Sequence, residues 1–177
     1  PLVDEHWELY AENLPARSVA GDFYDCWRVD DRLAIVMADV SGKGIPAAFY
    51  MAVTRTMLRN LAEQISEPAQ LLNTGNGFLC EQSIGSMFVT LFYGLLDLKT
   101  GRLDYANAGH LPPVLLHSES PDAPRTVCPA TGTVLGVLPE QTWEAGTLIM
   151  KPGDTLVLYT DGVTEAMTPD GTMLEES

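Results

Sequence analysis

The apolar residues of this 177-residue chain change their spacing twice, and no other feature constrains the fold as strongly. From Phe23 to Val29 they alternate with polar residues, and from Leu33 to Val40 they form a short continuous run; both patterns are typical of strands. From Pro46 to Ile65 they recur at every third or fourth position, which predicts a helix with a wide apolar stripe. Strand patterns return after Ser86.

The remaining elements follow from the same reasoning. A second helix is expected to begin at Pro68 and to continue toward Leu79. Asp97–Gly101 is expected to form a hairpin turn, and Ser118–Arg125 a polar, disordered loop. Strands followed by two helices and then by many strands favour an α+β fold with antiparallel sheets over a doubly wound parallel sheet. Further strands are expected at Trp7–Leu14, Met87–Leu96, Arg102–Asn107, Val114–Leu116, Thr142–Met150 and Thr155–Thr160.

Composition narrows the class of protein. With 10 basic and 24 acidic residues, the chain lacks the basic surface that a nucleic acid requires. No apolar run approaches the roughly 20 residues of a membrane span, and the N-terminal residues do not resemble a signal peptide. Cys26, Cys80 and Cys128 are far apart and show no metal-binding or disulfide spacing, which favours a reducing compartment, the cytoplasm. We expect residues 1–177 to form one domain, excised from a longer chain.

Three aspartates are the best candidates for chemistry. Asp39 ends the apolar run that starts at Leu33, Asp161 follows the apolar run from Thr155 to Thr160, and Asp22 lies beside Gly21. A carboxylate at the end of a buried strand is costly unless it is paired or binds a cation. Short carboxylates without nitrogen or sulfur ligands favour Mg²⁺ or Mn²⁺ over zinc. Taken singly, each aspartate is better explained as a turn or cap residue. Three such residues, two of them ending apolar runs, instead favour an oxygen-ligated metal site, and the residues alone stop there.

A series of motifs in a fixed order extends this interpretation. The motifs are Gly21-Asp22-Phe23-Tyr24-Asp25, Asp39-Val40-Ser41-Gly42-Lys43-Gly44, Asn107-Ala108-Gly109-His110, Leu135-Gly136 and Tyr159-Thr160-Asp161-Gly162-Val163-Thr164-Glu165-Ala166. One of these motifs would be weak evidence, whereas five in order are specific, and together they span most of the chain. In these motifs the chain resembles the stage-II-sporulation and sigma-factor-regulating branch of the PPM (type 2C) protein phosphatases.

The resemblance implies an αββα sandwich, two antiparallel sheets flanked by helices, and a site with two Mg²⁺ or Mn²⁺ ions. Asp39 would bridge the two ions and the Val40 carbonyl would contact one of them. Asp161 would hold the first ion, Asp22 the second ion or its waters, and Glu165 a weaker third ion. The family also carries a further metal-binding aspartate near its C-terminus, which this sequence does not contain. We therefore expect the domain to be incomplete at its C-terminus, which leaves the occupancy of the Asp161 side open.

The implied activity is the hydrolysis of phosphoserine or phosphothreonine by a metal-activated water, without a covalent enzyme intermediate. The implied substrate is a phosphorylated regulatory protein such as an anti-sigma-factor antagonist. The implied upstream partner is a sensor or receiver domain, whose signal could reach the stripe on the Pro46–Ile65 helix, and no membrane contact is expected. The alternative is a catalytically weak pseudophosphatase that binds a phosphoprotein. A Ca²⁺-binding structural domain has little support, because the sequence contains no EF-hand loop.

Four other polar residues have two interpretations each. Arg17 could contact the substrate phosphate through its guanidinium, or it could be a solvated surface residue. Lys43 is interpreted as a turn or surface residue, because the full phosphate-loop motif is absent. His110 is interpreted as a stabiliser of its loop rather than a general acid, and Asp25 as a structural residue rather than a metal ligand.

Overall fold

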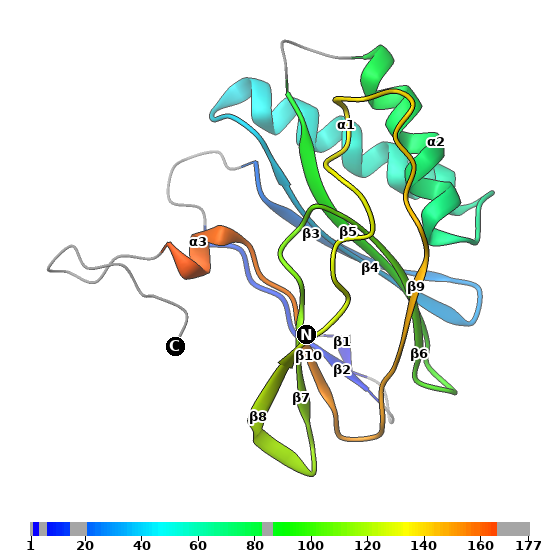
Figure 1. Cartoon of the computed structure of the whole chain (residues 1–177), viewed down its shortest axis with the longest axis vertical. Helices are drawn as coiled ribbons and strands as arrows, with labels where there is room; N and C mark the ends of the chain where they lie inside the picture. The colour runs from blue at the N-terminus through cyan, green and yellow to red at the C-terminus, as the bar shows by residue number, and fades with distance from the viewer. Residues whose placement is uncertain (1, 4–6, 15–20, 83–86, 166–177) are drawn as a thin grey trace, which may run out of the picture.

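The computed structural model describes residues 2–3, 7–14, 21–82 and 87–165. Its centre is a five-stranded antiparallel sheet with the strand order β3-β4-β5-β6-β9, and a three-stranded sheet with the order β10-β7-β8 lies beside it (Figure 1). A third sheet pairs β1 with β2. The bounds are β1 Leu2–Val3, β2 Glu8–Leu9, β3 Phe23–Val29, β4 Arg32–Val40, β5 Val89–Asp97, β6 Arg102–Ala108, β7 Val114–His117, β8 Ser120–Thr126, β9 Gly146–Ile149 and β10 Thr155–Val157.

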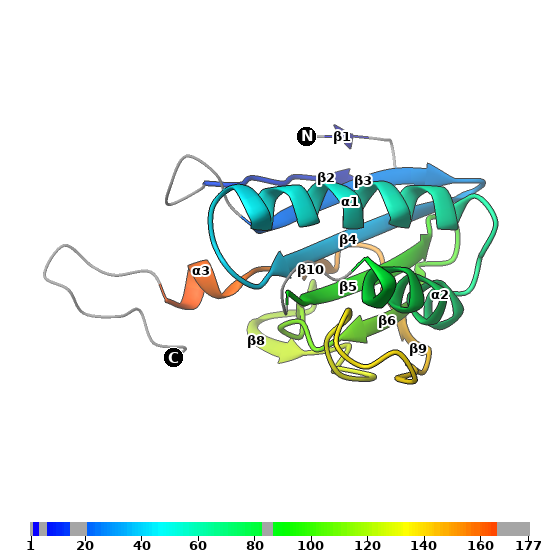
Figure 2. The ribbon, with the colours of Figure 1, turned by 90° about the horizontal axis from the view of Figure 1, so that it is seen from above.

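Two long helices cover one face of the five-stranded sheet. Helix α1 (Ile45–Ala62) lies against β3 and β4, and α2 (Pro68–Glu81) lies against β5 and β6 (Figure 2). Each helix has a proline in its first turn, where the missing N–H costs no hydrogen bond. The Glu67 carboxylate caps α2 by accepting hydrogen bonds from the backbone N–H groups of Ala69 and Gln70, at 3.0 and 2.6 Å. A third helix, α3 (Asp161–Thr164), is a single turn.

Alternate residues of the central strands supply two separate apolar layers. In β5, Leu91, Tyr93 and Leu95 join the core between the sheet and the helices, whereas Phe92 joins a second cluster with Leu103 on the opposite face. Residues near the three-stranded sheet, including Val127, Leu156 and Leu158, pack against that second cluster. The five-stranded sheet is therefore covered on both faces, by helices on one side and by the smaller sheet on the other, as the two-residue period of a strand requires.

The expected fold class is confirmed: two antiparallel sheets flanked by helices form the domain. The Asp97–Gly101 hairpin is also confirmed, because the Gly101 N–H donates to the Asp97 carbonyl at 2.9 Å and the Asp97 carboxylate accepts from the N–H groups of Lys99 and Thr100. Of the helices in the described part of the chain, none is long and apolar enough to cross a membrane.

Several expected boundaries were wrong. The expected loop at Ser118–Arg125 is in fact a turn followed by β8, which pairs with β7 through backbone hydrogen bonds. Because the described side chains of β8 are exposed, that strand needs no apolar alternation, and its pattern could not be recognised. The expected strands at Thr142–Met150, Thr155–Thr160 and Trp7–Leu14 are shorter, since only the residues of β9, β10 and β2 pair with neighbours.

Candidate active site

The three candidate aspartates lie at the ends of strands from two different sheets. Asp39 is the penultimate residue of β4, and Asp22 directly precedes β3, whose first residue pairs with Ala38. Asp161 begins α3, four residues after the end of β10. Antiparallel pairing of β3 with β4 therefore brings Asp22 beside Asp39, and the packing of the two sheets brings the Asp161 segment toward both.

The carboxyl group of Asp39 is surrounded by other carboxylates. Burial, a hydrogen bond with Asp22 and the negative charges of Asp22, Asp161 and Glu165 together raise its pKa to about 7. Every one of these influences favours the protonated form of Asp39. Such a group of carboxylates is poised to accept a cation, because a positive ion would relieve all of these repulsions at once.

A direct hydrogen bond joins the two halves of the site. The Thr160 hydroxyl donates to a carboxylate oxygen of Asp22 at 2.8 Å, so the segment that follows β10 is tied to the start of β3. The side-chain amide of Asn13 donates to the Asp22 backbone carbonyl at 3.1 Å. Both contacts fix the orientation of the Asp22 residue before any ligand is present.

The backbone around Val40 is shaped by glycines. A Cβ on Gly21 would lie 2.6 Å from the Val40 carbonyl oxygen, so only glycine allows this close approach. Gly42 and Gly44 have φ values of 97° and 75°, which let the chain turn sharply from β4 into α1. The exposed Lys43 lies in this turn, consistent with its interpretation as a surface residue.

The Asn107-Ala108-Gly109-His110 motif forms a buried polar network. The Asn107 amide donates to the backbone carbonyls of His110 and Cys128, both at 3.1 Å, and its carbonyl oxygen accepts from the His110 N–H at 2.8 Å. The His110 ring contacts the Thr90 hydroxyl at 3.0 Å and the Tyr159 carbonyl at 3.2 Å. Burial lowers the pKa of His110, although the Tyr159 contact and the charges of Asp22 and Asp161 act in the opposite direction.

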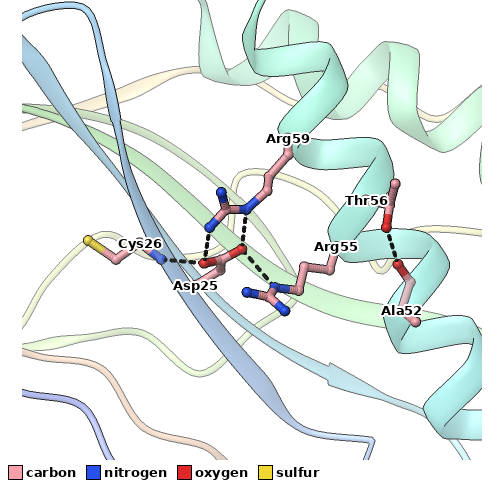
Figure 3. A network of polar contacts seen from close by, with 6 residues as sticks. All are labelled: Asp25, Cys26, Ala52, Arg55, Thr56 and Arg59. Carbon is pink, nitrogen blue, oxygen red and sulfur yellow. Dashed lines mark hydrogen bonds and ion pairs between the residues drawn. The ribbon is translucent and has the colours of Figure 1, made fainter.

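Asp25 belongs to a different network. Its side chain is 6% exposed and accepts hydrogen bonds from Arg55 at 2.8 Å and from Arg59 through two nitrogens at 2.7 Å each (Figure 3). The Arg59 guanidinium also lies 4.8 Å from the centre of the Trp27 ring. Burial alone would raise the pKa of Asp25, but these hydrogen bonds outweigh it and lower the pKa to about 2. Asp25 thus ties β3 to α1, which supports its structural interpretation.

The donor chemistry of the site suits a hard cation. The carboxylates of Asp22, Asp161 and Glu165 act electrostatically on that of Asp39, and Val40, whose carbonyl is a further oxygen donor, directly follows Asp39 in the sequence. In the described part of the chain, no group of three or more His, Cys, Asp or Glu side chains is yet arranged to enclose a metal ion. All of these donors are oxygen atoms, which is the donor type that Mg²⁺ and Mn²⁺ prefer.

Sequence reasoning missed two hydroxyl groups, those of Thr90 and Thr160, which contact His110 and Asp22. Thr160 directly precedes Asp161, so its position next to a candidate ligand was a usable signal. Thr90 lies within an apolar strand, and only the strand register places it opposite Asp39. Arg17 lies outside the described residues.

The two layered antiparallel sheets define the fold class of the PP2C-type phosphatases, and solved structures of that class share the fold. The RsbU and RsbW domains of Rv1364c from Mycobacterium tuberculosis match 87% of this chain and 42% of that chain, with a TM-score of 0.76 and 30% identity. The PP2C phosphatase domain and regulatory-domain fragment of SpoIIE from Bacillus subtilis match 83% of this chain and 43% of that chain, with a TM-score of 0.71 and 23% identity.

Sequence comparison identifies the particular family. The model of stage II sporulation protein E (SpoIIE) matches residues 29–177, and the chain belongs to this family. Protein IcfG of Synechocystis is 36% identical over 93% of this chain and 30% of its own length. Phosphoserine phosphatase RsbU of Bacillus subtilis is 32% identical over 95% of this chain and 50% of its own length. The chain thus spans half or less of the length of these two relatives.

Proposed function

We propose that this domain is a Mg²⁺- or Mn²⁺-dependent protein phosphatase that hydrolyses phosphoserine or phosphothreonine on a regulatory protein, such as an anti-sigma-factor antagonist. The observation that carries the proposal is the environment of Asp39. Burial and the neighbouring carboxylates of Asp22, Asp161 and Glu165 raise the pKa of Asp39 to about 7. Two relatives bear the name phosphoserine phosphatase, which supports the choice of substrate class.

Each residue of the site has a defined task in this proposal. Asp39, Asp22 and Asp161 would hold the two ions, and the Val40 carbonyl and Glu165 would complete the set of ligands. When bound, the ions would lower the pKa of a water and neutralise charge on the phosphoryl oxygens. Gly21 leaves the Val40 carbonyl accessible in a space that any larger residue would fill. Asp39 must lose its proton to act as a ligand, which favours activity at neutral or higher pH.

The cysteines of the chain are poor nucleophiles. Cys26 and Cys80 are partly buried and Cys128 is buried. Burial raises the pKa of all three thiols, that of Cys128 to about 12. A cysteine-dependent phosphatase requires a thiol whose pKa is lowered. This contrast supports attack by water rather than by a thiolate.

The outer side of α1 and α2 supports the proposal that an upstream sensor or receiver domain controls this one. Phe49 of α1 and Phe78 of α2 are 63% and 43% exposed, and with neighbouring residues they line an apolar groove of about 570 Å³. Both curated relatives extend well beyond the part that this chain matches, so a further domain is a reasonable occupant. Phe49→Glu and Phe78→Glu should leave folding intact and abolish regulation in the full-length protein. Unchanged regulation would refute this part of the proposal.

A pseudophosphatase that binds a phosphoprotein is the second candidate. It is favoured by one observation: the carboxylates of the described residues do not yet enclose a metal ion. The two functions differ in turnover, because a binding module would retain the phosphopeptide without releasing phosphate.

The test is phosphate release from phosphoserine, phosphothreonine and phosphotyrosine peptides, with Mn²⁺ or with EDTA. We expect turnover of the first two peptides only, dependent on Mn²⁺. Isothermal titration with the same peptides reports binding separately. Peptide binding and Mn²⁺ binding without any phosphate release would favour the pseudophosphatase.

A further inference from the structure

His110 connects three segments that are distant in the sequence. It lies just after β6 and is only 4% exposed. One ring nitrogen, Nδ1, lies 3.0 Å from the hydroxyl of Thr90 in β5, and the other, Nε2, lies 3.2 Å from the carbonyl oxygen of Tyr159 beyond β10. The ring thus spans from the five-stranded sheet to the segment that leads out of the three-stranded sheet.

Both ends of this connection adjoin a candidate metal ligand. Thr90 pairs directly with Asp39 in the register of β5 with β4. Tyr159 lies two residues before Asp161. The backbone of His110 is itself held by Asn107, which binds both its N–H and its carbonyl. A displacement of the ring would therefore change the separation between the strand ends that carry Asp39 and Asp161.

The chemistry of the two partners determines the ring tautomer. A backbone carbonyl only accepts hydrogen bonds, so Nε2 must carry a proton to bind Tyr159. In a neutral ring Nδ1 is then the acceptor, and the Thr90 hydroxyl must donate to it. Burial disfavours the charged ring. Both nitrogens are consequently occupied, which leaves no free N–H to protonate a leaving group.

We propose that His110 is a positioning residue: a neutral imidazole strut between Thr90 and Tyr159 that sets the separation of Asp39 from Asp161. The role in metal binding rests on the proposed function, whereas the strut itself does not. Residues that orient metal ligands in this way affect metal affinity about 10- to 100-fold when they are replaced.

The test uses a pair of substitutions at Thr90. Thr90→Val keeps the shape of the side chain but removes the donor, and Thr90→Ser keeps the hydroxyl. Thr147→Val is the matched control, because Thr147 is a strand threonine on β9 whose hydroxyl donates to Asp104 at 2.7 Å, at the far edge of the sheet. Amide hydrogen exchange without metal, Mn²⁺ affinity by calorimetry and thermal stability are measured for all four proteins.

In Thr90→Val, we expect exchange at the N–H groups of Val163 and Glu165, which donate to the Thr160 and Asp161 carbonyls, to accelerate by about tenfold or more. Mn²⁺ affinity should fall by about tenfold or more. Thr90→Ser should lie within about threefold of the wild type in both measurements, and Thr147→Val should change neither. In the wild type, nitrogen NMR of the imidazole should show the proton on Nε2 of His110.

Three results would overturn the proposal. The first is unchanged exchange in Thr90→Val, the second is a proton on Nδ1, and the third is accelerated exchange with unchanged Mn²⁺ affinity, which would leave His110 as a loop stabiliser only. A wild-type chain that binds no Mn²⁺ would refute the proposed function instead. The amide exchange of Thr90→Val and the position of the His110 ring proton would then still decide whether the strut exists.

Discussion

Two aspartates on neighbouring strands of the same sheet have opposite environments. Asp25 on β3 accepts hydrogen bonds from Arg55, Arg59 and the Cys26 N–H, and these outweigh the effect of burial to give a pKa of about 2. Asp39 on β4 has a pKa of about 7, because burial is reinforced by other carboxylates rather than offset by arginines.

The difference shows how the same residue type can be compensated by the protein at one position and left uncompensated at another. Asp25 is buried and Asp39 is partly buried, and removing a carboxylate from water costs free energy in either case. At Asp25 the protein itself supplies the compensating charges, so the carboxylate connects β3 to α1. At Asp39 the surrounding carboxylates add negative charge, which favours the protonated form when no cation is bound, and in the proposed function a bound cation would supply the compensation.

The largest expected effect is a loss of activity that Asp39→Asn should show and Asp25→Asn should not. Asp39→Asn should reduce Mn²⁺-dependent phosphate release by about 10³-fold or more, because a neutral amide cannot hold two cations. Asp25→Asn should reduce kcat by less than about tenfold, because Asp25 lies outside the candidate site. Steady-state kinetics on a phosphoserine peptide measures both values.

Asp31→Asn is the control for this pair. This substitution makes the same chemical change in the β3–β4 turn, where the Asp31 carboxylate is 81% exposed and forms an ion pair with Lys99. Equal losses of activity in Asp25→Asn and Asp39→Asn would remove the distinction between the two aspartates.

The second prediction concerns folding stability at neutral pH. Asp25→Asn should lower the free energy of unfolding by about 1–3 kcal/mol, because charge-assisted bonds to both arginines are weakened. The loss is limited because the arginine side chains are 50% and 45% exposed and remain solvated. Urea unfolding gives the difference, and a change below about 0.5 kcal/mol, typical of a surface site, would contradict the structural role of Asp25.

The third prediction is that the contributions of Asp25 and Asp39 to folding stability depend on pH in opposite directions. Asp25 has a folded-state pKa of about 2, below its usual value of 3.8, so its contribution is present above that value and is lost as the pH falls toward 2. Asp39 has a folded-state pKa of about 7, so its contribution is present below 3.8 and is lost as the pH rises through 7.

Metal-free Asp39→Asn should therefore gain stability relative to the wild type by about 1–3 kcal/mol between pH 4 and pH 8. The lower stability of Asp25→Asn relative to the wild type should disappear only in strong acid, as the pH falls toward 2. Urea unfolding across this pH range, with EDTA present, measures both. A difference between Asp39→Asn and the wild type that does not change with pH would show that Asp39 is not held among uncompensated carboxylates.

The smallest expected effect is a difference in folding stability between substitutions of Arg59 and Arg55. Arg59 binds Asp25 through two nitrogens and lies over Trp27, whereas Arg55 binds through one nitrogen. Arg59→Lys should cost about 1 kcal/mol, and Arg55→Lys about 0.5 kcal/mol or less, because lysine cannot reproduce a forked contact. Unfolding at low and high salt checks the order, and the reverse order would place the main contact on Arg55.

Much of this fold could be predicted from the sequence. The alternation from Phe23 to Val29 and the run before Asp39 located β3 and β4, because their buried faces require regular apolar spacing. Helix α1 was predicted from its period and from Pro46, although it ends at Ala62 rather than at Ile65. Strand β8 was missed because backbone pairing alone stabilises it and its described side chains face solvent.

The candidate site was predicted only in part. Asp22, Asp39 and Asp161 could be selected as carboxylates at strand ends, and their ligand roles remain predictions. The partners of Asp25 could not be selected. Arg55 visibly interrupts the apolar face of its helix, but nothing in the sequence connects Arg55 or Arg59 with a carboxylate about thirty residues away. Thr90 could not be selected either, since its relation to Asp39 and His110 depends on strand register and on the packing of two sheets.

The central claim is that the carboxylates around Asp39 are compensated by a metal ion, and proton release on Mn²⁺ binding tests it most directly. Calorimetric titrations in buffers of different ionisation enthalpy, at about pH 6 and about pH 8.5, give the number of protons released. Because Asp39 has a pKa of about 7, the wild type should release about one more proton at the lower pH than at the higher, and Asp39→Asn should not show this difference. Equal proton release by the wild type at both pH values, or unchanged Mn²⁺ affinity in Asp39→Asn, would contradict the account.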